Sequence, residues 1–151
     1  MPGTALWYHG GVPGLRRGQQ ILPPSVTGAR VLTTSPHPEG EKWITAVYSS
    51  DLVYVTTSLS AARLFASVAP ANGGKRHGGD VYEVIPDGPL RPDPDYLGLD
   101  GAQMACESAT IVRILARRVP RPDPGQIRVL AAVTRAAWES PRAQARRNAV
   151  R

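Results

Sequence analysis

Glycine and proline interrupt this chain so often that neither long helices nor long strands are expected. The 151 residues include 15 glycines and 15 prolines, so about a fifth of the chain is turn-forming. That content favours short strands joined by many loops over a helical bundle. With 42% hydrophobic residues, a normal globular value, the chain fits one domain with a single core.

Four segments are predicted to be strands, namely residues 5–9, 52–57, 80–85 and 108–115. The clearest is Leu52–Thr57, because nearly all of its residues are β-branched or aromatic. Gly10-Gly11 is expected to end the first strand, and Pro86–Pro89 is expected to close the third. The remaining segments are less regular: loops are expected at residues 12–30 and 71–79, and a strand or a helix start at residues 43–48.

Capping signals and apolar spacing predict helices after the second strand and near the C-terminus. Ser58 or Ser60 can cap the first helix. The apolar residues of that helix recur at helical spacing: Leu59, Ala62, Phe65, Ala66 and Ala69. Asp123-Pro124-Gly125-Gln126 has the form of a helix start, because aspartate caps, proline suits the first helical position and glutamine completes a capping box. Ser140-Pro141 repeats the cap-and-proline signal for a short last helix.

The net charge of +6 is concentrated near the C-terminus. Residues 1–112 contain eight Lys and Arg and ten Asp and Glu, a balance of −2, whereas residues 113–151 contain ten arginines and two acids, a balance of +8. A basic segment of this kind can hold phosphates or nucleic acid. The alternative is a solvated, arginine-rich helical face. We expect an α+β domain over residues 1–120 with a basic helical extension, residues 121–151, packed on it.

Nothing in the sequence requires export, a membrane or a metal. The single cysteine, Cys106, cannot form an internal disulfide and is expected to be a buried thiol. No apolar run is long enough to span a membrane, and the first twenty residues lack the core of a signal peptide, so we expect a cytoplasmic protein. His37 and His77 have no metal-ligand partners at useful spacing, so no metal site is expected.

Three short motifs place polar or aromatic side chains at the ends of predicted strands. The first is Trp7-Tyr8-His9-Gly10-Gly11, and the second is Val-Tyr-Val-Thr-Thr-Ser-Leu-Ser-Ala-Ala at residues 53–62. The third, at residues 81–95, is Val-Tyr-Glu-Val-Ile-Pro-Asp-Gly-Pro-Leu-Arg-Pro-Asp-Pro-Asp. A histidine, a tyrosine and an acid at strand ends suit the binding of a nicotinamide nucleotide and the cleavage of its glycosidic bond.

In order and composition these motifs resemble the rifampin ADP-ribosyltransferases, small bacterial members of the ADP-ribosyltransferase superfamily. The resemblance covers residues 6–95 with gaps. The third motif is the most specific, because a Gly-Pro turn between a Tyr-containing strand and Asp-Pro is unusual. The resemblance implies an α+β fold with a split β-sheet and an NAD cleft. It also implies a mono-ADP-ribosyltransferase that consumes NAD, releases nicotinamide and modifies a hydroxyl of a small molecule such as a rifamycin, a form of antibiotic resistance.

The resemblance assigns catalytic roles to His9, Tyr54 and Asp93. The NAD-binding histidine corresponds to His9, the nicotinamide-stacking tyrosine to Tyr54 and the acid to Asp93, while the backbone of Gly10 is expected to pair with the carboxamide. Nicotinamide leaves with its bonding electrons, so the ribose becomes oxocarbenium-like, and a carboxylate can stabilise that cation. His9 can hydrogen-bond a ribose hydroxyl, and Tyr54 can stack on the pyridinium ring. None of this needs a metal.

Other residues have alternative roles. Thr56 and Ser58 are candidates for the cofactor site, and ordinary helix capping is the alternative. Asp95 and Glu107 are alternatives to Asp93 as the acid. Gly11 stands where the family usually has threonine, and the match fades after Asp95.

Three other functions remain open from the sequence. A toxin-type ADP-ribosyltransferase would modify a protein or a nucleic acid, using the basic C-terminal segment. An RNA 2′-phosphotransferase would need basic residues for a phosphate, and the three motifs offer only Arg91. A catalytically degenerate fold would bind NAD without turning it over.

Overall fold

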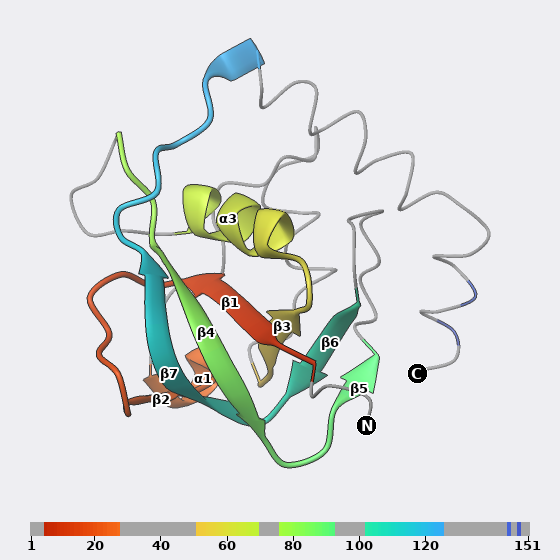
Figure 1. Ribbon diagram of the computed structural model, residues 1–151. Helices are drawn as coiled ribbons and strands as arrows, with labels where there is room; N and C mark the ends of the chain where they lie inside the picture. Colours follow the sequence, from red (N-terminus) through yellow and green to blue (C-terminus); the bar gives the residue numbers. More distant parts are fainter. Residues whose placement is uncertain are drawn as a thin grey trace.

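The computed structural model describes residues 5–27, 51–69, 76–92 and 102–125, together with residues 145 and 148. Its centre is a seven-stranded sheet in the order β2-β7-β4-β1-β3-β6-β5, in which every described strand pair is antiparallel (Figure 1). Two helices lie wholly within the described residues: the short α1 (Pro24–Thr27) and the longer α3 (Leu59–Val68), which lies across one face of the sheet. This combination confirms the predicted α+β class.

Three predicted strands have nearly the expected bounds: β3 (Val53–Thr56), β4 (Asp80–Asp87) and β7 (Ser108–Ala116). The prediction that Pro86–Pro89 closes β4 is partly wrong, because the strand continues through Asp87 along its neighbour β7. The turn therefore begins at Gly88, where a φ of 86° favours glycine.

The first predicted strand appears as β1 (Trp7–Gly11), two residues longer than expected at its C-terminal end. The glycine pair does not end it, because Gly10 pairs with Val81 and Gly11 pairs with Asp80 in β4. Central position in the sheet thus keeps the two glycines extended despite their weak strand propensity.

Four short elements were not predicted: β2 (Gln20–Ile21), α1, β5 (Arg91–Pro92) and β6 (Gln103–Cys106). The prediction of a continuous loop over residues 12–30 is therefore wrong. β2 and β5 are each two residues long and arise through pairing with β7 and β6, respectively. Strands this short cannot be predicted from the local sequence, since a neighbouring strand supplies their hydrogen bonds.

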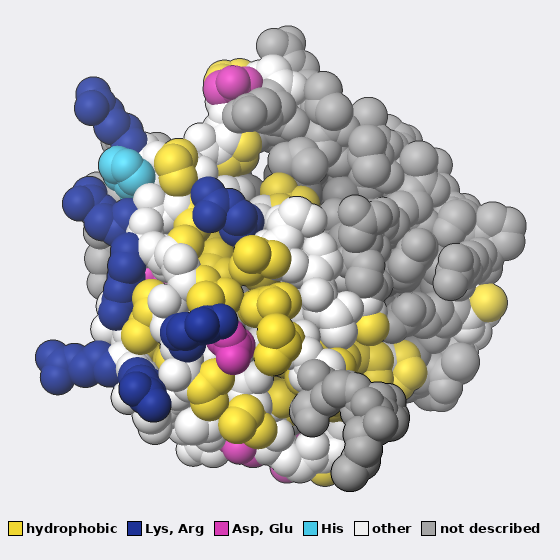
Figure 2. Space-filling model, viewed as in Figure 1, with side chains coloured by type: hydrophobic (Ala, Val, Ile, Leu, Met, Phe, Trp, Pro, Cys, Tyr) yellow, Lys and Arg dark blue, Asp and Glu magenta, His cyan; other side chains and the backbone are white. Residues whose placement is uncertain are grey.

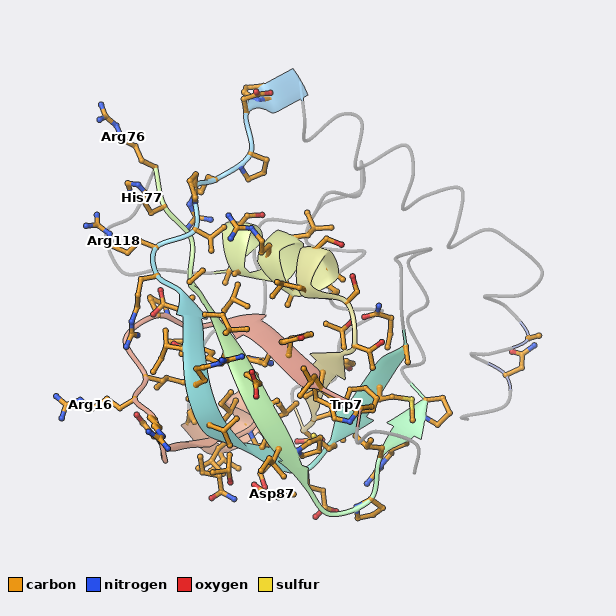
Figure 3. The ribbon with its side chains drawn as sticks, viewed as in Figure 1. Trp7, Arg16, Arg76, His77, Asp87 and Arg118 are labelled. Atoms are coloured by element: carbon orange, nitrogen blue, oxygen red, sulfur yellow. The ribbon has the colours of Figure 1, made fainter. Side chains whose placement is uncertain are left out.

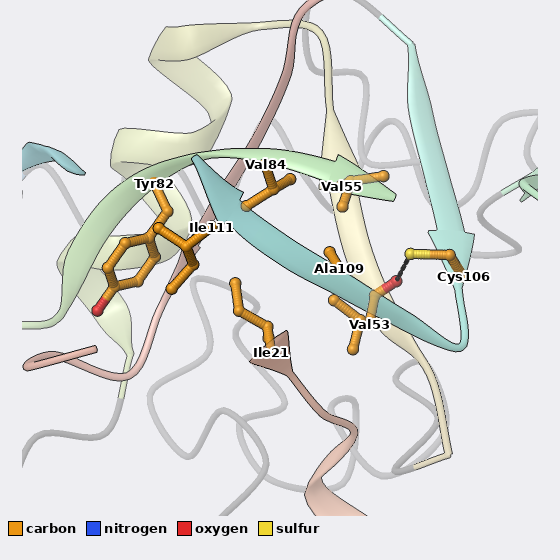
Figure 4. Packing of buried hydrophobic residues seen from close by; sticks show 8 residues of the cluster. All are labelled: Ile21, Val53, Val55, Tyr82, Val84, Cys106, Ala109 and Ile111. Carbon is orange, nitrogen blue, oxygen red and sulfur yellow. Dashed lines mark hydrogen bonds between the residues drawn. The ribbon is translucent and has the colours of Figure 1, made fainter. Parts of the chain in front are cut away.

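Apolar side chains pack on both faces of the sheet. The larger cluster, shown in Figure 4, contains Ile21, Val53, Val55, Tyr82, Val84, Cys106, Ala109 and Ile111. The cluster beneath α3 consists of smaller side chains: Ala62, Ala66, Val81 and Val119. Small residues on the helix let its backbone approach the sheet closely.

The start and the buried face of α3 largely match the prediction. Ser58 caps the helix by accepting a hydrogen bond from the backbone N–H of Ala61 at 3.2 Å. Ala62, Ala66 and Ala69 are buried as expected. Leu59, which shares their helical spacing, is 45% exposed. It occupies the first turn, outside the alanine-lined contact with the sheet.

The close approach of α3 leaves no room for a side chain at Gly10. A Cβ atom there would overlap the carbonyl oxygen of Ala62 and would lie 2.7 Å from the backbone nitrogen of Ala66. Both obstacles are backbone atoms of the helix, so they cannot rotate away as a side chain could. Packing against α3 is therefore enough to require glycine at position 10.

Of the C-terminal extension, the structure describes residues 121–125 and the single residues 145 and 148. Residues 124 and 125 are helical, in agreement with the helix start predicted at Asp123-Pro124, and residues 145 and 148 are helical as well. Most of residues 121–151, like residues 43–48 and 71–75, lie outside the described part of the chain. Within the described part, no helix is long and apolar enough to cross a membrane.

Replacing Gly10 by alanine is expected to lower the free energy of unfolding by about 3 kcal/mol, because overpacking against a helix backbone forces β1 and α3 apart. Urea unfolding measures this change. The matched control is Gly88→Ala, where no atom lies within 4 Å of the new methyl group and only the positive φ is strained. We expect about 1 kcal/mol there. Equal losses in the two variants would contradict the packing role of Gly10.

Candidate functional site

The fold brings the three sequence motifs onto three adjacent central strands. β1 carries the first motif, β3 begins the second and β4 begins the third, and the sheet order places β1 between the other two (Figure 1). His9 of β1 is paired with Tyr82 of β4, and Tyr8 is paired with Thr56 of β3. Segments far apart in the chain therefore converge on β1.

The pairing between β1 and β3 is limited to one residue pair. Tyr8 and Thr56 are in register, whereas β1 and β4 share five pairs. Next to that single pair, Nδ1 of the His9 side chain lies 2.8 Å from the carbonyl oxygen of Tyr54. The His9 side chain thus bonds to β3 where a backbone N–H of β1 would otherwise do so. The strands on the β1 side of the sheet and those on the β3 side are therefore joined by few backbone hydrogen bonds. We call this place the β1–β3 junction.

The hydrogen bond to Tyr54 determines the state of the His9 ring. A carbonyl oxygen can only accept, so Nδ1 carries the proton and Nε2 keeps a lone pair. Burial lowers the pKa of His9, and the bond to the Tyr54 carbonyl raises it by a smaller amount. The net direction is downward, so His9 is neutral at neutral pH and offers Nε2 as a hydrogen-bond acceptor.

Gly11 supports the position of the His9 ring. A Cβ atom on Gly11 would overlap Nε2 of His9 and would lie 3.2 Å from its Cδ2. The ring therefore lies directly over the α-carbon of Gly11. This contact gives a physical reason for glycine at the position where the resembling family has threonine.

The side chains of His9 and Tyr54 leave the sheet on opposite faces. His9 shares a face with its partner Tyr82, which packs in the same cluster as Val53 and Val55. Tyr54 lies between those two valines in β3, so strand alternation turns its ring the other way. A ligand that touches both side chains must therefore reach across the β1–β3 junction.

Thr56 and Ser58 have structural roles at the start of α3. Thr56 is buried, and its Oγ1 accepts a hydrogen bond from the Ser58 N–H at 3.0 Å. Ser58 caps the helix in turn. These bonds hold the segment after Tyr54 rigidly, and the cofactor contacts expected of Thr56, Ser58 and Gly10 stay predictions.

Of the three acids that the sequence offers as catalytic candidates, Glu107 lies within the described residues. Asp93 and Asp95 lie outside the described residues, directly after β5. Glu107 is exposed in the turn between β6 and β7, where it forms an ion pair with Arg91 at 3.7 Å. Arg91 is in register with Ala105, and Ala105 with Tyr54, so Arg91 lies two strand spacings, about 10 Å, from Tyr54.

A buried acid that sequence reasoning missed fixes the loop after β1. Asp80 is 1% exposed, and its carboxylate accepts hydrogen bonds from the N–H groups of Gly14 and Arg118 and from the Arg117 guanidinium, at 2.9, 2.7 and 2.6 Å. Burial by itself would raise the pKa of Asp80, but these donors outweigh it and the net shift is downward. We call this set of contacts the Asp80 hub. The sequence did contain a signal for these contacts: Asp80 is the first residue of one strand, and Arg117 and Arg118 directly follow another.

Tyr82 adds to the same loop anchor. Its hydroxyl donates to the carbonyl oxygen of Val12 at 2.6 Å and accepts from the N–H of Leu15 at 3.2 Å. Burial raises the pKa of Tyr82 to about 12, so the phenol stays protonated. Because Asp80 is paired with Gly11, the anchored loop begins directly beside the His9 ring.

Cys106 is buried, as predicted. Its thiol lies 3.2 Å from the carbonyl oxygen of Ser108, and burial together with the charge of Asp87 raises its pKa to about 11. A thiol in that state is a poor nucleophile. Cys106 therefore belongs to the core.

Comparisons with known proteins leave the functional interpretation to the residues themselves. No protein-family model matches the chain, and neither does any curated protein. The features available for interpretation are the β1–β3 junction, the neutral His9 within it and the Asp80 hub that anchors the neighbouring loop.

Replacing Gly11 by alanine is expected to push the His9 ring out of its place. The ring then becomes hydrated, and its pKa rises toward the ordinary value of about 6.5. The measurement is an NMR titration of the histidine ring protons. Gly14→Ala is the control for backbone strain alone, since its φ of 88° disfavours a side chain but nothing lies within 4 Å of a Cβ there. An unchanged His9 titration in Gly11→Ala would show that the ring does not depend on this glycine.

Replacing Asp80 by asparagine is expected to cost about 3 kcal/mol of stability at pH 7, because Arg117 loses its buried partner. The folded-state pKa of Asp80 is below its unfolded value, so the charge stabilises the protein above the unfolded pKa, and this contribution is lost as the pH falls through the folded pKa. The gap between wild type and variant should therefore close on acidification, as measured by urea unfolding across pH.

Asp87→Asn is the matched control for that experiment. Its carboxylate accepts hydrogen bonds from Thr110, Ser108 and Gln20, all neutral donors. We expect a smaller loss, about 1 kcal/mol. A gap between wild type and Asp80→Asn that stays constant with pH would contradict a charge-based role for the Asp80 hub.

Proposed function

We propose that this protein is an NAD-dependent mono-ADP-ribosyltransferase whose nicotinamide site lies at the β1–β3 junction. One observation carries the proposal. His9 and Tyr54, which are 45 residues apart and belong to different motifs, are joined by a 2.8 Å hydrogen bond at the narrow junction of two central strands. A ligand bound there would meet an acceptor nitrogen from one motif and an aromatic ring from the other.

His9 would bind the ribose next to nicotinamide. Its Nε2 keeps a lone pair because Nδ1 donates to Tyr54, and its lowered pKa keeps the ring neutral. A neutral Nε2 accepts a hydrogen bond from a ribose hydroxyl and does not repel the positively charged pyridinium. The Gly11 contact holds the ring in that orientation before the ligand arrives.

Tyr54 would stack on the nicotinamide ring. Stacking and cation–π attraction both favour a tyrosine face against a pyridinium. Residues on either side of Tyr54 are buried in β3, and Thr56 ties the following segment to the cap of α3. The ring is thus presented from a rigid element, which limits the entropy lost on binding.

Asp93 would stabilise the developing cation. The C1′–nitrogen bond breaks, nicotinamide takes the electron pair, and the ribose becomes oxocarbenium-like. An acceptor hydroxyl then attacks C1′ and releases its proton to solvent, with the carboxylate orienting that hydroxyl. The register of β5 with β6 and β3 supports this role, because Arg91, two residues before Asp93 in the chain, lies two strand spacings, about 10 Å, from Tyr54. A hydroxyl of a rifamycin is the proposed acceptor.

The proposal predicts that the purified protein releases nicotinamide from NAD and that rifampicin stimulates the release. Asp93→Ala should lower the rate about 100-fold or more, since it removes charge stabilisation of the transition state, and should retain most NAD affinity. Tyr54→Ala should weaken NAD binding about tenfold, measured by calorimetry, whereas Tyr54→Phe should preserve it because the ring remains.

Specific outcomes would overturn parts of this proposal. Full activity in Asp93→Ala would remove that residue from catalysis, and loss of activity in Glu107→Gln instead would assign the role to Glu107. Release that ignores rifampicin would keep the enzyme class and direct the search to a macromolecular acceptor. No release from NAD by the wild-type protein would reject the transferase function.

A further inference from the structure

Four exposed arginines from three separate segments lie along one edge of the molecule. Arg16 and Arg17 belong to the loop after β1, Arg76 precedes β4, and Arg118 follows β7. Figure 3 shows Arg16, Arg118 and Arg76 pointing outward along this edge, and Figure 2 shows dark-blue side chains there in space-filling form. We call these four residues the arginine edge.

Backbone and side-chain contacts fix the three segments next to one another. The Arg117 guanidinium donates to the carbonyl oxygen of Leu15 at 3.0 Å, which places the loop tip beside the end of β7. The segment before β4 is joined to the segment after β7 by backbone hydrogen bonds. The N–H of Gly78 donates to the carbonyl oxygen of Val119 at 2.8 Å, and the N–H of Arg121 donates to the carbonyl oxygen of Arg76 at 2.9 Å. The edge is therefore a property of the folded chain, assembled across more than 100 residues.

The arginine edge is electrostatically uncompensated among the described residues. Elsewhere in the described part of the chain, Arg113 is paired with Glu83 and Arg91 with Glu107. Asp80, which accepts a hydrogen bond from the backbone N–H of Arg118, is buried and already paired with Arg117. No ion pair involves the four edge arginines within the described ranges, so they present a charge of +4 to solvent.

Arg118 has an unusual backbone conformation. Its φ of 49° is in the left-handed region, which costs a residue with a side chain about 1 kcal/mol. The 2.7 Å bond from its N–H to Asp80 holds this conformation. The fold thus accepts local strain at an arginine whose side chain is exposed on the edge, and such strain is concentrated at functional positions.

We propose that the arginine edge binds the phosphate backbone of double-stranded nucleic acid without reading its sequence. Arginine is suited to phosphate, because its planar guanidinium donates two parallel hydrogen bonds. The edge offers no exposed aromatic side chain among the described residues on which unstacked bases could lie. Backbone contact to a duplex needs only charge and donors spread along a surface.

Two other occupants fit the edge less well. A single pyrophosphate requires donors that converge on one point, whereas the labelled arginines extend outward at separate places (Figure 3). An acidic protein partner usually buries aromatic or large apolar residues at the centre of its interface. In the loop beside the edge, Val12 is the large apolar residue that is exposed among the described residues, at 41%. One exposed valine is a small apolar centre for such an interface.

Fluorescence anisotropy with a labelled DNA duplex of about 20 base pairs, without NAD, tests this proposal at roughly 50–200 mM salt. The result is therefore independent of any transferase activity. Arg16→Gln combined with Arg118→Gln should weaken binding roughly tenfold or more and reduce the slope of log affinity against log salt by about 2, since each phosphate contact contributes about 0.9. Circular dichroism verifies that the variant remains folded.

The control combines Arg63→Gln with Arg91→Gln. These two arginines are exposed on α3 and β5, and replacing them removes the same amount of positive charge. The control should keep the wild-type slope. Equal effects in the two variants would reduce the binding to net charge and overturn the proposal. No duplex binding by the wild-type protein would overturn it as well, as would equally strong competition by polyglutamate, which would indicate an acidic protein partner.

Discussion

The buried carboxylate of Asp80 is the interaction on which the arrangement of this molecule most depends. A charged group with 1% exposure is tolerated only when donors surround it, and here two backbone N–H groups and one guanidinium do so. Those donors come from the loop after β1 and from the end of β7. Asp80 thus holds the loop that follows the first motif against the end of β7. The same contacts position the loop beside His9 and the Arg118 backbone in the arginine edge.

β1 shows how one strand can serve packing and chemistry with two neighbouring glycines. Gly10 faces α3, where a Cβ would overlap the helix backbone, whereas Gly11 faces the other way and lies beneath the His9 ring. Strand alternation separates these duties, since successive residues point to opposite faces. The helix can therefore press against one face while the imidazole bridges to β3 at the other, and the β1–β3 junction stays open enough for a side chain to replace a backbone bond.

Local patterns predicted the longer elements and failed for the shortest. The β-branched run at β3, the strands β4 and β7 and a serine cap at Ser58 or Ser60 were all predicted from the sequence, because propensity and capping act within a few residues. β5, an Arg-Pro pair, and β6, which contains glutamine and alanine, have no such signal. Leu59 shares the helical spacing of Ala62 and Ala66, yet it is 45% exposed whereas both alanines are fully buried.

The sequence by itself determined the α+β class, a helix cap at Ser58 or Ser60, the buried state of Cys106 and the motif order that suggested NAD chemistry. Only the tertiary structure decided that the three motifs lie on adjacent strands, that His9 bonds to the Tyr54 carbonyl, and that four arginines share one edge. The physical reason is range. Capping and strand propensity depend on neighbours in the chain, whereas the His9–Tyr54 and Arg117–Leu15 contacts join residues 45 and 102 positions apart, which become partners only after the sheet has formed.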